Sequence, residues 1–265
     1  TSPAKQAGVV SKDMLIPVAG NTALKIESFR LNDSETAVLL QTDAEAVYRH
    51  SEISWYYVLD LITKKLTSVS DIKKQRLAEI SPDGSKVAYI IDNNLYFKDL
   101  ATGKETQITY DGLINNIING TTDWVYEEEF SFTQAFFWSP DSKKIAFMRF
   151  DESSVKEYQM TSYGELYPEQ YKYKYPVAGE DNSVVSVLVY DLSNPSKAQT
   201  RVMDVGAETD QYIPRLCWTK NPETLAIFRM NRPQNKLEIL LADASSGNSR
   251  VFLTQENKYY IEITD

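Results

Sequence analysis

The sequence predicts an all-β fold, a β-propeller built from four-stranded blades, with about four blades in this chain. Its 265 residues include 17 Tyr, 10 Phe and 4 Trp, with many short runs of Val, Ile and Thr, and these residue types favour strands. Long amphipathic helices are hard to find. A unit of two strands and two turns recurs, and repeats of about 40 to 50 residues with this content are typical of propeller blades.

The first half of each unit is a polar turn followed by an apolar strand. Asn, Pro, Asp, Ser and Gly favour the turn because they either adopt its backbone angles or bond to its amides. Three copies and a weaker fourth share this layout: 32–39 (NDSETAVL), 82–89 (PDGSKVAY), 140–147 (PDSKKIAF) and 220–227 (KNPETLAI).

The second half of each unit is a strand that ends in an aspartate, whose carboxylate should bond to nearby backbone amides. The interval between the second and third of these aspartates is 92 residues, and it falls to 44 when two atypical stretches, 112–131 and 155–182, are set aside. Four similar units remain, so these stretches are predicted to be an insertion and an extended arm. The four aspartates are Asp60, Asp99, Asp191 and Asp243.

A β-sandwich is the alternative fold, because it also alternates short strands with turns. The repeat favours the propeller. Four blades need not close a ring. The first strand of the first unit has no obvious partner, and residues 259–264 read as the start of a new strand. The sequence therefore predicts part of a larger propeller.

Charge and composition exclude several classes of partner. The chain has 28 basic and 37 acidic residues, for a net charge of -9, which argues against nucleic acids and anionic membranes. No run of 18 apolar residues predicts a membrane span, and no signal peptide is recognised. Cys217 and His50 are the only residues of their kinds, which excludes an internal disulfide and a His-rich or Cys-rich zinc site. Any metal would need oxygen ligands, and no metal or cofactor site is expected.

The insertion carries three adjacent carboxylates, Glu127, Glu128 and Glu129, flanked by aromatic residues. Thr122 or Asp123 could cap a short helix, but the glutamates would then lie toward its C-terminal end, where the helix dipole disfavours anions. Apolar neighbours pull the segment inward while the charges resist desolvation, so a cationic group should meet them. The alternatives are a solvated acidic loop and a calcium site, although the usual Asp-rich loop with its glycine is missing.

Two other features have both a functional and a structural interpretation. Arg49 is a candidate counter-charge for the glutamates, or simply a surface cation. The arm over 155–182 contains six tyrosines, and the alternation across 171–175 suits an exposed strand. It is therefore either an association surface or a flap folded onto its own blade. The chain has no G-x-S-x-G elbow and no glycine-rich phosphate loop, and its single histidine argues against a self-contained Ser-His-Asp hydrolase.

Residues 123–129, DWVYEEE, resemble the double-glutamate motif of the dipeptidyl peptidase IV family, serine exopeptidases of the prolyl oligopeptidase class. The resemblance covers nearly the whole chain, which looks most like bacterial members of the family. The seven-residue acidic motif is the part of the resemblance that is specific to the family. Further segments occur in the family's order and approximate spacing: 49–51 (RHS), 57–61 (YVLDL), 138–140 (WSP), 167–168 (YP), 175–179 (YPVAG) and 212–235.

The resemblance implies an eight-bladed propeller followed by an α/β-hydrolase domain that carries the catalytic residues and is not in this chain. Residues 1–265 would then be a partial propeller, inactive alone. Glu128 and Glu129 are implied to hold the α-ammonium of the substrate, with Glu127 in possible support. Arg49 is implied to contact a substrate carbonyl oxygen and to steady the acidic cluster, and Tyr167 of the arm to make contacts in a homodimer.

The function that follows from the resemblance is substrate recognition in an enzyme that releases X-Pro or X-Ala dipeptides from free N-termini. The partners expected are such peptides and a second copy of the chain, and the location expected is the bacterial periplasm or cell envelope. The alternatives are a noncatalytic peptide- or protein-binding propeller and a tripeptide-releasing relative. A G-x-S-x-G motif in a following domain would favour an enzyme over a binding module.

Overall fold

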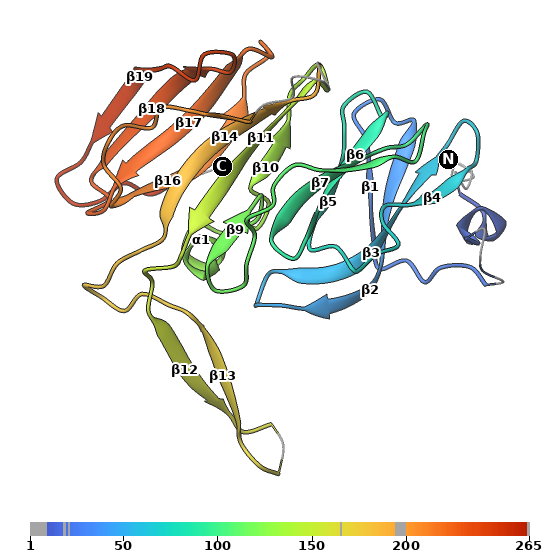
Figure 1. The fold of residues 1–265 in the computed structure, drawn as a ribbon, viewed down its shortest axis with the longest axis horizontal. Coiled ribbons are helices and arrows are strands. Elements are labelled where there is room, and N and C mark those ends of the chain that lie inside the picture. Colours follow the sequence, from blue (N-terminus) through green and yellow to red (C-terminus); the bar gives the residue numbers. More distant parts are fainter. Residues whose placement is uncertain (1–9, 18–19, 21, 165, 194–199, 264–265) are drawn as a thin grey trace, which may run out of the picture. The chain divides into compact units, whose positions relative to one another are not determined.

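The computed structural model describes residues 10–17, 20, 22–164, 166–193 and 200–263. These residues form two compact units, each dominated by antiparallel sheets (Figure 1). The first unit collects the described residues up to 47 with 52–91 and 96–106, and the second collects 48–51, 92–95 and 107–263.

The first unit contains two four-stranded sheets, ordered β1-β2-β3-β4 and β5-β6-β7-β8, and a short 3-10 helix, η1. A few residues of β7 and β8 group with the second unit. The core of the first unit includes Val58, Val87 and Tyr89, which are almost inaccessible to solvent. The elements are η1 (Lys12–Leu15), β1 (Ser28–Leu31), β2 (Ala37–Ala46), β3 (Glu52–Asp60), β4 (Leu66–Ser68), β5 (Ala78–Ile80), β6 (Lys86–Ile91), β7 (Asn94–Asp99) and β8 (Glu105–Gln107).

The second unit contains the sheets β10-β11-β14-β15, to which β9 is added, and β16-β17-β18-β19, with a separate hairpin, β12-β13. Its core runs through both sheets and includes Met148, Ile213 and Ile227. The elements are β9 (Ile117–Asn119), α1 (Trp124–Glu129), β10 (Phe136–Trp138), β11 (Lys144–Asp151), β12 (Glu157–Ser162), β13 (Glu169–Lys174), β14 (Val184–Asp191), β15 (Thr200–Val202), β16 (Gln211–Trp218), β17 (Thr224–Asn231), β18 (Lys236–Asp243) and β19 (Ser249–Glu256).

These sheets have the form of propeller blades, so the predicted fold class and the predicted number of blades are confirmed. Three of the four sheets are meanders of strands that follow one another in the sequence, and the third blade differs in that the hairpin β12-β13 lies between its paired strands β11 and β14. The aspartates predicted to end the second strand do so on β3, β7, β14 and β18. Each accepts backbone N–H bonds from the turn that follows, as Asp60 does from Ile62 and Thr63 at 2.8 Å.

The insertion interrupts one strand of the third blade. β10 pairs with residues 145–147 of β11 and β9 pairs with residues 149–151, so the two strands lie in line along one edge of β11. The chain between them leaves the sheet and returns, and its base is closed by the bridge between Thr121 and Gln134 and by the bond from Ala135 N to Gly120 O at 3.0 Å. Helix α1 is therefore held at the end of a short excursion from a blade strand.

Two expectations about the ends of the repeat are wrong. The first strand of the first blade has a partner, because β1 pairs with residues 38–41 of β2. All four β1 residues are exposed, and the strand is only four residues long. No strand forms over 259–263, and Thr264 lies outside the described residues. Ile261 is buried and its N–H bonds to Gln234 O at 2.7 Å, but one bond does not make a ladder.

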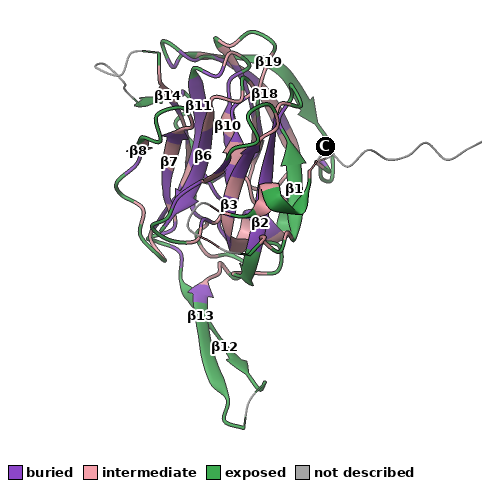
Figure 2. Cartoon of the chain, turned by 90° about the vertical axis from the view of Figure 1, so that its right-hand side faces the viewer, coloured by how far each residue is buried: buried purple, intermediate pink, exposed green. Residues whose placement is uncertain are grey.

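Burial differs sharply between the blades and the hairpin. Figure 2 shows β6 and β11 largely buried, whereas β12 and β13 are exposed along almost their whole length. None of the described helices has the length and apolar content needed to cross a membrane.

Candidate functional site

Asp123 is the N-cap of helix α1, so the capping residue is the second of the two candidates. Asp123 Oδ1 accepts the N–H of Tyr126 at 2.9 Å, which satisfies one of the amides that a helix leaves open at its start. Its other oxygen accepts the hydroxyl of Ser183 at 2.6 Å, and the residue is buried. Thr122 instead donates its hydroxyl to Phe132 O at 3.1 Å. Both carboxylate oxygens of Asp123 therefore fix the helix in the blade.

Tyr126 anchors the helix to the core of its unit. Its ring is 1% exposed and packs against Phe130, Phe150 and Tyr212 at centroid distances of 5.1, 4.9 and 6.1 Å. Its hydroxyl oxygen accepts the backbone N–H of Ile213 at 2.8 Å, and burial raises the pKa of Tyr126 well above its ordinary value of 10. The neutral phenol thus satisfies an amide of β16 while its ring fills the core.

The three glutamates occupy three different environments, because successive helical residues point about 100° apart. Glu127 has no exposed surface, and its Oε1 accepts the N–H of His50 at 2.8 Å. Glu128 is partly buried, and its Oε2 lies 3.4 Å from Nη1 of Arg49. Glu129 is exposed, and no hydrogen bond or ion pair of its carboxylate occurs within the described part of the chain. Burial thus falls steadily from Glu127 to Glu129.

Arg49 lies beside the acidic cluster, which agrees with the counter-charge interpretation of the two that the sequence left open. Among the described residues its ion pair is with Glu128, and its side chain remains 74% exposed, so most of its hydrogen-bonding capacity faces solvent. The role of His50 was missed. Its imidazole drew attention as the only one in the chain, but the backbone N–H, which no composition argument reveals, is the group that meets Glu127.

A cavity of about 200 Å³ adjoins the helix on the side of Glu129. Many of its lining residues are aromatic or aliphatic, but polar atoms make up most of the surface that faces it. Its cation, Arg232, is already paired with Asp210 at 2.7 Å and with Glu180 O at 3.1 Å. Glu129 therefore remains the unneutralised charge at this cavity among the residues described. The other lining residues are Trp124, Val125, Phe130, Tyr175, Pro176, Val177, Ala178, Asn182, Tyr212 and Gln234.

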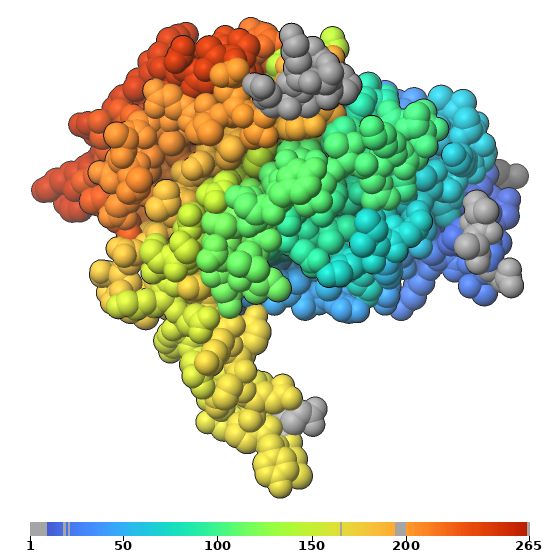
Figure 3. Space-filling model, viewed as in Figure 1, coloured from blue at the N-terminus to red at the C-terminus, as the bar shows by residue number. Residues whose placement is uncertain are grey.

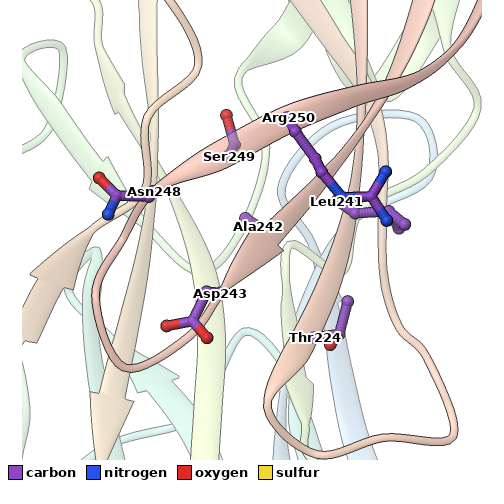
Figure 4. A pocket seen from close by; sticks show the side chains of 7 residues that line it. All are labelled: Thr224, Leu241, Ala242, Asp243, Asn248, Ser249 and Arg250. Carbon is purple, nitrogen blue, oxygen red and sulfur yellow. The ribbon is translucent and has the colours of Figure 1, made fainter.

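A second pocket, lined by residues of β18, β19, their connecting turn and Thr224 of β17, is a weaker candidate for a binding site (Figure 4). Its carboxylate, Asp243, is engaged by the turn that follows, where it accepts the N–H of Ser246 at 2.7 Å. Within the described ranges, no three His, Cys, Asp or Glu side chains converge on a possible metal position. The acidic helix is therefore the stronger candidate site.

The arm extends away from the blade sheets of its unit, as Figure 3 shows. Tyr167, the residue implied to make dimer contacts, lies in the turn of the hairpin and is 79% exposed. The structure does not bring Tyr167 together with the glutamates. The base of the hairpin is different, because Tyr173 and Tyr175 pack against Trp124 of the helix at 6.0 and 4.6 Å. The flap interpretation therefore applies to the base of the arm, and the exposed-surface interpretation to its tip.

Residues 32–265 match the family described as the dipeptidyl peptidase IV (DPP IV) N-terminal region. Among solved structures, Porphyromonas gingivalis dipeptidyl peptidase 4 is similar over 95% of this chain and 35% of that one, with 37% identity and a TM-score of 0.87. A putative dipeptidyl aminopeptidase IV from Bacteroides ovatus shares the fold, with a TM-score of 0.70 over 96% of this chain and 34% of that one at 23% identity.

Curated relatives include a probable dipeptidyl-aminopeptidase B of Podospora anserina, 33% identical over 80% of this chain and 24% of the relative. The mouse prolyl endopeptidase FAP is 31% identical over 89% of this chain and 32% of its own length. The chain thus spans about a quarter to a third of these relatives. With the family match covering nearly all of its length, the chain belongs to the dipeptidyl peptidase IV N-terminal region family.

Proposed function

We propose that this chain is the substrate-recognition part of a serine exopeptidase that releases X-Pro or X-Ala dipeptides from free N-termini. Glu128 and Glu129 hold the α-ammonium of the substrate in this proposal. The proposal rests on a difference between the side chains at α1. Asp123, Tyr126 and Glu127 each accept a hydrogen bond from a backbone N–H. The Glu129 carboxylate, in contrast, has no partner in the described structure.

The chemistry of an ammonium group fits this pair of carboxylates. An ammonium has three N–H donors and no acceptor, and each charge-assisted bond to a carboxylate contributes about 1.5 to 3 kcal/mol. Glu128 and Glu129 are adjacent, one half-buried and one exposed, so a ligand can reach both from solvent. Arg49, with most of its guanidinium free of protein contacts, is proposed to bond a carbonyl oxygen of the same substrate.

Fixing the amine sets the position of the cut. If the carboxylates lie a dipeptide's length from the nucleophilic serine of a following hydrolase domain, only the bond after the second residue reaches that serine. A peptide with an acylated N-terminus lacks the charge and is excluded. The selectivity for Pro or Ala would reside in that domain.

The test is hydrolysis of a Gly-Pro chromogenic amide, with free and N-acetylated amine, by the full-length protein that contains this chain. We expect cleavage of the free form alone, and a loss of about 100-fold or more in kcat/KM for Glu129→Gln, which corresponds to about 2.7 kcal/mol. Equal cleavage of both substrates would contradict the amine anchor. Release of tripeptides would indicate a more distant anchor, and no cleavage by an intact protein would favour a noncatalytic binding module.

We also propose that the arm over 155–182 joins two copies of the protein, and that the protein works in the bacterial periplasm or envelope. The exposed tyrosines near the hairpin turn, Tyr163 and Tyr167, support the first part, because tyrosine is enriched at protein interfaces. Sedimentation of Tyr167→Ala should show a weakened dimer. An unchanged dissociation constant would exclude Tyr167 from the interface, and cell fractionation tests the location.

A further inference from the structure

One ring of the arm behaves unlike its neighbours. Tyr173 is 7% exposed, although it lies in β13 of a hairpin whose other described residues are exposed or, at the last position of β13, half-buried. Its hydroxyl lies 3.1 Å from Sδ of Met160, across the hairpin. A single buried ring on an exposed hairpin marks the place where the hairpin is held by the rest of the protein.

The ring lies between two segments that support the proposed ammonium site. Its centroid is 6.4 Å from that of Tyr48 and 6.0 Å from that of Trp124, both within the range of favourable aromatic contacts. Tyr48 immediately precedes Arg49. Trp124 opens helix α1 and lies one turn before Glu128, so the two side chains share a face of the helix.

The contact is one of packing. Burial, helped by the neighbouring tyrosine rings and by the charge of Glu128, raises the pKa of the Tyr173 hydroxyl above its ordinary value of 10. The ring is therefore neutral at physiological pH and adds no charge beside Glu128. What it supplies is a fixed surface against which both segments rest.

We propose that Tyr173 is a positioning residue, whose ring holds the segment 48–51 against Trp124 and so sets the place of Arg49 relative to Glu128. The pair needs such a support, because the Arg49–Glu128 contact is long, at 3.4 Å, and Arg49 is largely exposed. This inference rests on the proposed function and extends it: the arm is part of the substrate site as well as a candidate dimer surface.

The kinetic test uses the full-length protein and a Gly-Pro chromogenic amide. Tyr173→Val removes the ring but keeps a residue that suits a strand. We expect KM to rise about tenfold while kcat changes less than about twofold, because binding of the amine weakens equally in the ground state and the transition state. Tyr173→Phe retains the ring and should restore KM. Lys172→Ala, at the exposed neighbouring position of β13, is the matched control and should leave KM unchanged.

A readout beyond activity separates positioning from general destabilisation. In Tyr173→Val, hydrogen exchange should accelerate at the amides of 49–51 and 124–130 and stay unchanged in β16–β19. Combining Tyr173→Val with Arg49→Gln should raise KM by less than the product of the two single effects, because both act on one contact. Effects that multiply fully, or unchanged exchange at 49–51, would overturn the proposal.

Glu128→Gln distinguishes the two proposals. If it leaves KM unchanged, the ammonium site itself is wrong, whereas the exchange data still decide whether Tyr173 holds the segment. If Glu128→Gln raises KM and Tyr173→Val does not, the positioning role alone is wrong. Should Tyr173→Val fail to fold, Tyr48→Leu removes the same ring contact from the opposite side and must raise KM in the same way.

Discussion

The carboxylates of the blade turns and those of helix α1 are the same chemical group put to two uses. Asp60, Asp99, Asp191 and Asp243 each turn their oxygens back onto backbone amides within three residues. At α1, Asp123 likewise accepts the N–H of Tyr126, three residues later, and Glu127 accepts the N–H of His50, 77 positions earlier. Glu128 and Glu129 receive no backbone N–H among the described contacts. A carboxylate that the backbone does not use is available to a ligand.

The largest effect expected from this difference concerns catalysis. Glu128→Gln, which removes one charge and little volume, should lower kcat/KM for a free-amine Gly-Pro amide about 100-fold, or about 2.7 kcal/mol. The free energy of unfolding should change by less than about 0.5 kcal/mol, because the ion pair with Arg49 is long, at 3.4 Å, and the arginine is largely exposed to solvent. Steady-state kinetics and urea unfolding measure the two quantities. A large loss of stability with normal kinetics would place Glu128 with the structural carboxylates.

The helix cap should affect both properties. Asp123→Ala removes the acceptor of the Tyr126 N–H and leaves the hydroxyl of buried Ser183 without its partner, which should cost about 2 kcal/mol of unfolding free energy. We expect kcat/KM to fall as well, since α1 carries the glutamates. Asp123→Asn, an equally good cap, is the matched control. If alanine and asparagine behave alike, the cap is not what holds the helix.

A blade turn should affect stability alone. Asp60→Ala removes two backbone hydrogen bonds on an exposed turn, so we expect a loss of about 1 kcal/mol in urea unfolding and a kcat/KM within about twofold of wild type. A tenfold loss of activity would mean that the turn and the site are coupled.

The smallest expected effect is a dependence of the free energy of unfolding on pH in the acidic range. The hydroxyl of Ser245 and the N–H of Ser246 lower the pKa of Asp243 from 3.8 to about 2. A lowered pKa stabilises the folded state in full above 3.8, and this stabilisation is lost as the pH falls through about 2. Because Asp243 is exposed, we expect only a few tenths of a kcal/mol. Asp243→Asn should flatten the fall of the urea midpoint between about pH 4 and pH 2, and an unchanged slope would contradict this origin.

Features that depend on neighbours in the sequence could be predicted. The four turn aspartates recur because each bonds to amides within three residues. The helix cap falls on Asp123, one of the two residues that the sequence offered for it. Helix α1 and the hairpin β12-β13 likewise fall within the predicted insertion and arm.

Features that depend on contacts between distant parts of the sequence could not be predicted. Arg49 and Glu128 are 79 positions apart, and nothing in either segment specifies the other. The burial of Tyr173 was hidden within an alternation that suits an exposed strand, because its cover comes from Tyr48 and Trp124. The predicted strand over 259–264 depends on a distant contact in the same way, because a segment becomes a strand only when an adjacent strand provides backbone hydrogen-bond partners.

The hydrogen bond between the Tyr126 hydroxyl and Ile213 N limits whether residues 123–129 can be grafted onto another blade. Ile213 lies where the pairing of β16 with β17 shifts register, between Tyr212 and Arg215, and its amide is satisfied by a side chain 87 positions earlier. An engineer who grafted DWVYEEE onto another blade would transfer the carboxylates without the bulge that receives the tyrosine. The graft would have to include both the motif and the bulged strand that receives its tyrosine.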